Sequence, residues 1–121
     1  MSFAQAQYRT TTVNTASPVR LLVQLYDGAI RFMSQAIEAH KTGDNATRGE
    51  RLRRAHAVVT ELQVSLIPSH APELCEELER LYDFVLYAIA EGSMYGRVEK
   101  VPGAINVMRE LRSAWHELAS R

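Results

Sequence analysis

The sequence SPVRLLVQLYDGAIRFMSQAI, residues Ser17–Ile37, predicts a long helix that is covered on several sides. Ser17 can cap this helix, because its hydroxyl can accept a hydrogen bond from a free N–H of the first turn. Pro18 suits the first helical position, where the chain needs no N–H partner. Polar residues then recur at helical spacing and fall on one narrow stripe: Arg20, Gln24, Asp27, Arg31, Ser34 and Glu38. The rest of the circumference is apolar or small, so it must be buried.

The dipeptide Asp27-Gly28 within this stretch could instead indicate a β-hairpin turn. Hairpin strands alternate with period two, whereas the helical period here continues unbroken on both sides of the dipeptide. We therefore predict one helix with an internal glycine, which costs about 1 kcal/mol relative to alanine. We expect that a neighbouring helix or the N-terminal arm packs closely on Gly28. A tolerated surface glycine is the alternative.

The composition is that of one globular domain. The chain has 121 residues, of which 46% are hydrophobic and 23% charged, and its formal net charge is zero. No overall charge attracts nucleic acid or an anionic membrane. We expect neither a signal peptide nor a membrane-spanning segment. The single cysteine rules out an intramolecular disulfide and fits a reducing cytoplasm.

Residues 1–16 show no sustained period and are rich in Gln and Thr, so we predict a mobile or loosely docked N-terminal arm. Residues 17–121 form the predicted helical-bundle domain. Its further helices span about 46–66, about 71–91 and about 102–119, and glycines predict a loop over 91–101. Each helix has an apolar seam with alternating steps of three and four residues. Short loops between such helices predict an all-α, antiparallel four-helix bundle.

Two surfaces have more than one interpretation. The second helix begins with an arginine-rich half, which could bind phosphate or acidic groups. The zero net charge favours a solvated face instead. The third helix is apolar around most of its circumference over 82–90, so this part is either the most buried of the fold or faces a partner.

No residue pattern indicates catalysis, a metal site or a cofactor. The chain has four histidines, none of which follows a glutamate by three residues as in di-iron bundles. Cys75 lies in an acidic first turn, which does not favour a reactive thiolate. The sequence also has no glycine-rich phosphate loop. Apolar surface beyond the needs of one core instead suggests a module that binds amphipathic segments.

Several motifs together resemble the flagellin-specific export chaperones of the FliS family. The most specific pair is Thr15-Ala16-Ser17-Pro18 followed by Leu25-Tyr26-Asp27-Gly28-Ala29-Ile30, with Tyr8 placed ahead of both. Further matches in the family's order are Leu81-Tyr82-Asp83 and Leu111-Arg112 with Ala114-Trp115. The resemblance covers about residues 8–115. The chain departs from the family over 90–103, where it is richer in glycine.

The resemblance implies an antiparallel helical bundle that acts as a cytoplasmic chaperone of flagellar type III export. Such chaperones bind the disordered C-terminal segment of flagellin, which wraps them as helical pieces, and prevent its premature polymerisation. Components of the flagellar export gate are a second class of partner to consider. The alternative is a generic helical-bundle adaptor or regulator that uses the same groove to form a homodimer.

We expect the groove for the client to lie within the apolar excess of the second and third helices. Some of its members must also belong to the core, and the sequence does not separate the two sets. The candidates are Val59, Leu62, Leu66, Leu81, Phe84, Val85 and Ile89. The resemblance also implies that the arm covers part of the groove in the free protein, with Tyr8 as its anchor.

Overall fold

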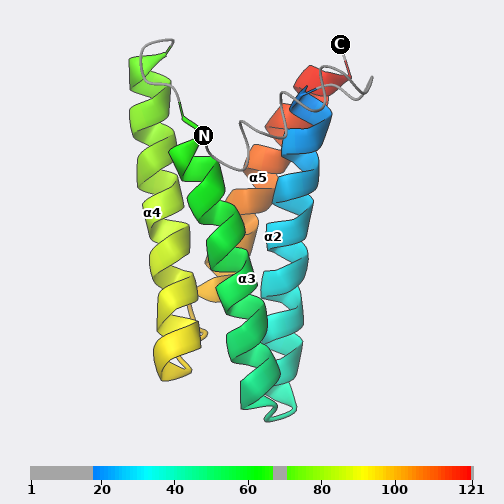
Figure 1. The fold of residues 1–121 in the computed structure, drawn as a ribbon, viewed down its shortest axis with the longest axis vertical. Coiled ribbons are helices and arrows are strands. Elements are labelled where there is room, and N and C mark those ends of the chain that lie inside the picture. Colours follow the sequence, from blue (N-terminus) through cyan, green and yellow to red (C-terminus); the bar gives the residue numbers. More distant parts are fainter. Residues whose placement is uncertain (1–17, 67–70, 121) are drawn as a thin grey trace.

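Four helices form an antiparallel bundle in the computed structural model, which describes residues 18–66 and 71–120 (Figure 1). They are α2 (Pro18–Lys41), α3 (Asn45–Val64), α4 (Pro72–Tyr95) and α5 (Val101–Ala119), and the described residues include no strand. The predicted fold class is thus confirmed. The predicted arm over 1–16 lies outside the described residues, as do its members Tyr8 and Thr15. The predicted helix cap Ser17 lies outside them too.

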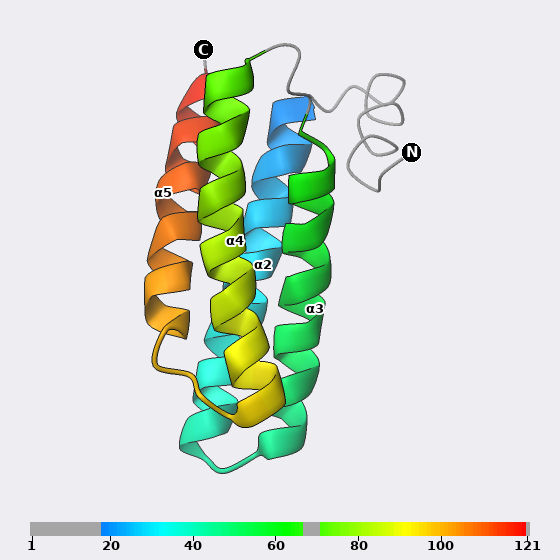
Figure 2. The same ribbon diagram turned by 90° about the vertical axis from the view of Figure 1, so that its left-hand side faces the viewer.

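The helices are arranged so that each packs against two neighbours (Figures 1 and 2). Contacts are extensive between α2 and α3, between α3 and α4, and between α2 and α5, but they are sparse between α4 and α5. All four helices contribute fully buried side chains to one core, the largest being Tyr26, Tyr82, Met33, Leu52 and Met108. Their mutual burial supplies the stability that isolated helices lack.

The turn between α2 and α3 contains a glycine that ends one helix and a carboxylate that caps the next. Gly43 adopts a positive φ of 77°, which glycine reaches without a steric penalty. Its N–H donates to the His40 carbonyl at 3.1 Å, and the Asp44 N–H donates to the Ala39 carbonyl at 2.9 Å. Asp44 then caps α3 by accepting a hydrogen bond from the Thr47 N–H at 3.0 Å. Hydrogen bonding from the Thr47 side chain, and secondly from its backbone N–H, lowers the pKa of the Asp44 carboxyl.

Helix α4 is one turn longer than predicted, because residues 91–95 are helical rather than part of a loop. It ends where Gly96 adopts a positive φ of 69°. Lys100 then donates to Glu91 at 2.8 Å, and Arg97 lies 3.7 Å from the same carboxylate. The hydrogen bond from Lys100 lowers the pKa of Glu91 and fastens the α4–α5 connection to the last turns of α4.

The expectation that a neighbouring helix packs closely on Gly28 is wrong, and the other expected neighbour, the N-terminal arm, lies outside the described residues. Among the described residues, a Cβ added to Gly28 would meet only the Arg31 guanidinium, at 4.0 Å. The glycine against which another helix packs is Gly92, which we predicted from the sequence to lie in a loop. A Cβ on Gly92 would lie 2.6 Å from Cδ1 of Leu52, a fully buried residue of α3. Gly92 therefore remains in a helix interior because α3 occupies the space of its side chain.

The two helical glycines predict opposite effects of the same substitution. Gly92→Ala should lower the free energy of unfolding by about 1–3 kcal/mol, because a methyl group overpacks the core against Leu52. Gly28→Ala is the matched control and should raise it by up to about 1 kcal/mol through helix propensity. Urea unfolding followed by circular dichroism measures both. Equal stabilisation by the two variants would contradict the close contact at Gly92.

Candidate functional site: the polar cluster and the apolar flank of α4

Three of the sequence motifs meet in one buried polar cluster. The Trp115 indole Nε1–H on α5 donates to the Tyr26 hydroxyl on α2 at 3.3 Å. The Tyr26 hydroxyl is also hydrogen-bonded to the Tyr82 hydroxyl on α4. Tyr26 is 0% and Tyr82 2% exposed, so these hydroxyls are paired inside the core. The cluster connects three of the four helices through hydrogen bonds.

Asp27, which follows Tyr26 in the motif, links α2 to α5 through an ion pair with Arg112. Arg112 donates through Nε to Asp27 Oδ1 at 2.7 Å and through Nη2 to Oδ2 at 3.5 Å. Both side chains are partly exposed, so this ion pair contributes modestly to stability and mainly orients the two helices. Leu25 is half-buried against the core, and Gly28 has open space around it.

The structure separates the seven predicted groove residues into two groups. Val59, Leu62, Val85 and Ile89 are at most 1% exposed and form part of the core. In the closed bundle Val59, Val85 and Ile89 are not available to a client, whereas Leu62 also lines a cavity at the end of the bundle. Leu81 and Phe84 are 36% and 39% exposed, and Leu66 is half-buried at the end of the bundle.

Helix α4 carries a second apolar row beside its core seam. The core seam consists of Cys75, Leu78, Tyr82, Val85, Ile89 and Gly92, all buried. The second row is exposed, and we name it the apolar flank of α4: Leu74, Leu81, Phe84 and Tyr95. Its members are separated by seven, three and eleven residues, which keeps them on one side of the helix. From Leu74 to Tyr95 the flank extends about 30 Å along the helix.

The flank lies on the side of α4 that turns toward α5. A Cβ added to Gly103, near the start of α5, would lie 3.6 Å from Cζ of Phe84. Figure 2 views the bundle with α4 in front and α5 beside it. Tyr87 and Met94, 56% and 68% exposed, add apolar surface further around α4. The groove residues predicted from the sequence do not include Leu74, Tyr87, Met94 or Tyr95. The excess of apolar residues in this helix was the signal that could have found them.

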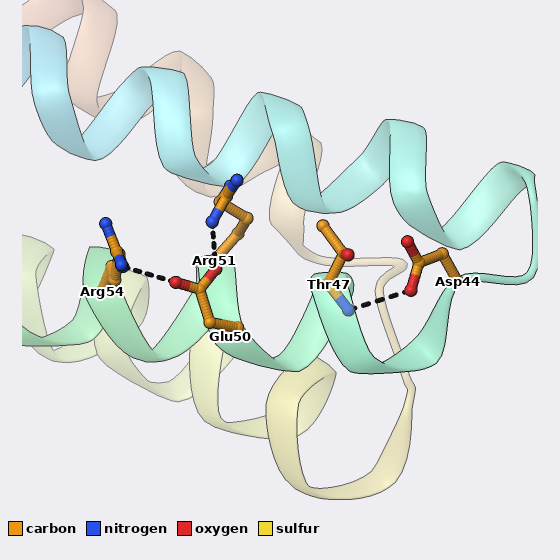
Figure 3. A network of polar contacts seen from close by, with 5 residues as sticks. All are labelled: Asp44, Thr47, Glu50, Arg51 and Arg54. Carbon is orange, nitrogen blue, oxygen red and sulfur yellow. Dashed lines mark hydrogen bonds and ion pairs between the residues drawn. The ribbon is translucent and has the colours of Figure 1, made fainter.

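In the arginine-rich half of α3, Arg53 and Arg54 are exposed, as a solvated face requires, whereas Arg48 and Arg51 are half-buried. Glu50 pairs with both Arg51 and Arg54 (Figure 3). The Arg54 guanidinium also lies 5.9 Å from the centroid of the Phe32 ring on α2. These cations are therefore engaged with a carboxylate and a ring of the protein itself.

The part of the chain that the structure describes contains no group of three or more His, Cys, Asp or Glu side chains that could hold a metal ion. Cys75 is buried. Within the same residues, no helix has both the length and the apolar character that a membrane crossing requires.

Comparison with known proteins identifies the family. The sequence matches the family described as flagellar protein FliS over residues 1–121. The chain belongs to the FliS family. It is 27% identical over 106 residues to the flagellar secretion chaperone FliS of Vibrio cholerae, covering 88% of this chain and 78% of that relative. It is 22% identical over 121 residues to the flagellar secretion chaperone FliS of Salmonella typhimurium, covering 99% and 89%.

A solved structure shares the fold of this FliS-family chain. It is described as a crystal structure of a flagellar chaperone from bacteria, and it superposes with a TM-score of 0.79. The two chains are 20% identical, and the match covers 97% of this chain and 95% of the other. The resemblance found in the motifs is thus confirmed, and the chain is an export chaperone of flagellum biogenesis. A chaperone acts by binding, which suits a chain with an exposed apolar flank.

Removal of the two hydroxyls of the polar cluster should lower the free energy of unfolding by different amounts. Tyr26→Phe should lower the free energy of unfolding by about 1–3 kcal/mol, because Tyr82 and Trp115 both lose a buried partner. Tyr82→Phe should cost less, about 0.5–1.5 kcal/mol, because the Trp115–Tyr26 bond remains. Exposed Tyr87→Phe is the matched control and should stay within about 0.5 kcal/mol of the native chain. If urea unfolding gives the same value for all three variants, the cluster does not contribute as argued.

Proposed function

We propose that this chaperone binds the C-terminal segment of flagellin in the cytoplasm, as a helix lying along the apolar flank of α4. In this way it prevents flagellin from polymerising before export by the flagellar type III system. The observation that supports the proposal is the row of exposed large apolar side chains on a helix whose neighbouring seam is fully buried. Family membership supplies the class of client.

The flank has the properties that coupled folding and binding requires. A client that is disordered when free loses conformational entropy on binding, so its interface must be long and apolar. A length of about 30 Å accommodates several turns of a client helix with apolar residues at i, i+3, i+4 and i+7. Met94 adds an adaptable apolar side chain near one end of the flank.

Two cations lie near the C-terminal end of α4. The Arg97 guanidinium lies 5.1 Å from the centroid of the Tyr95 ring in the flank, and the Lys100 ammonium lies 5.2 Å from that of Tyr87, which is outside the flank. Both cations also pair with Glu91, so their charge is partly neutralised within the protein. The buried Val85 and Ile89 contribute indirectly, because they hold α4 against the core behind the flank.

Substitution in the flank should weaken client binding without unfolding the chain. Phe84→Gln removes an exposed aromatic contact, so we expect about 10- to 100-fold weaker binding of a flagellin C-terminal fragment by titration calorimetry. Val64→Gln on α3 is the matched control: Val64 is also exposed and apolar but lies outside the flank. Both variants should keep the native thermal melt. Equal affinities of the two variants and the native chain would exclude the flank as the binding surface.

The N-terminal arm is proposed to compete with the client, with Tyr8 as its anchor. Burial of one such ring stabilises the docked arm by about 1.5–3 kcal/mol, partly offset by the entropy of ordering the arm. Deletion of residues 1–13 should therefore leave fragment binding unchanged or tighten it, and should increase dye binding or self-association of the free chaperone. Binding more than about tenfold weaker in a folded, monomeric truncation would instead make the arm part of the binding surface.

A further inference from the structure

A cavity of about 260 Å³ opens at the end of the bundle where α3 ends and α4 begins. Leucines from three helices form most of its apolar wall: Leu22, Leu62, Leu66, Leu74 and Leu78. Leu22, Leu62 and Leu78 are buried, whereas Leu66 is half-buried and Leu74 is exposed. Buried leucines thus form the bottom of the cavity, and the more exposed leucines lie at its opening.

Hydroxyl and indole groups in the cavity wall already have partners within the protein. The Ser65 hydroxyl donates to the Leu62 carbonyl at 2.8 Å. The Tyr82 hydroxyl is bonded to Tyr26, which also accepts from the Trp115 indole N–H. A polar ligand group would lose its hydration here without gaining those hydrogen bonds, so the cavity favours an apolar occupant.

The cavity continues directly from the apolar flank of α4. Leu74 is the first residue of the flank and also lines the cavity. A helix lying on the flank would therefore pass the cavity at one end. An apolar cavity of about 150 Å³ is large enough to hold benzene, so 260 Å³ has room for one large apolar side chain.

We propose that this cavity receives one large apolar side chain of the flagellin segment and thereby fixes the axial position of the client helix. The inference rests on the proposed function. A continuous apolar stripe permits a bound helix to slide by a turn, whereas a side chain inserted in a closed-ended pocket does not. The cavity is the anchor of the interface, and the flank is the surface along which the rest of the helix packs.

Filling the cavity tests this role. Ala71 lines the cavity and is half-buried, so Ala71→Phe should occupy it and weaken binding of a flagellin C-terminal fragment at least tenfold by titration calorimetry. Ala46→Phe is the matched control, because Ala46 is exposed in the first turn of α3, at the opposite end of that helix. Leu66→Trp fills the cavity from another wall and replaces Ala71→Phe if that variant does not fold.

Cys75 provides an independent reporter, because it lines the cavity and is the single cysteine of the chain. The rate of its modification by a small uncharged thiol reagent should fall at least tenfold when the fragment saturates the full-length protein. When each large apolar residue of the fragment is changed to alanine in turn, only one fragment variant should fail to protect Cys75 from modification. That variant should also bind at least tenfold more weakly.

The outcomes separate the cavity from the proposed function. A fragment that shows no binding to the native chain contradicts the proposed function itself. A fragment that binds the native, Ala71→Phe and Leu66→Trp chains equally overturns the cavity proposal and leaves the proposed function standing. Deletion of residues 1–13 could instead expose Cys75 to the reagent while Ala71→Phe and Leu66→Trp still bind the fragment normally. The arm would then be the occupant of the cavity, and the proposal is likewise overturned.

Discussion

The pairing of two tyrosine hydroxyls inside the core is the constraint on which the arrangement of the helices depends. A buried hydroxyl without a partner costs free energy, and the Tyr26 and Tyr82 hydroxyls are hydrogen-bonded to each other across the core. This bond favours one relative height of α2 and α4, and the bond from Trp115 to the same hydroxyl favours one height of α5. Apolar contacts alone would tolerate a shift of one helix along another, whereas a satisfied polar network does not.

Helix α4 performs two tasks through adjacent stripes. Its core seam is anchored by Tyr82, and the apolar flank beside it remains exposed because α4 packs only sparsely against α5. The same helix is therefore held rigidly in the fold and available to a partner. This division explains how a small bundle can present a long apolar surface and still have a complete core of its own.

The two glycines show why local sequence reasoning fails at close contacts. The periodic, apolar context of Gly28 suggested a packed glycine, and the glycine-rich context of Gly92 suggested a loop. Among the described residues, no other helix lies close to Gly28, whereas Gly92 lies against Leu52. Helix propensity and periodicity report on a single helix, but the space that a side chain may occupy is decided by a residue forty positions away in another helix.

Sequence alone determined the helical bundle and its family, because helical periodicity and the LYDGAI motif of residues 25–30 are local signals. It did not separate Val85 and Ile89 in the core from Phe84 in the flank, since a rotation of one residue moves a position from one stripe to the other. Only the packing of α3, α4 and α5 decided which stripe is buried and where a cavity remains at the end of the bundle. Burial is a property of neighbouring helices, and their relative rotation depends on contacts between residues far apart in the chain.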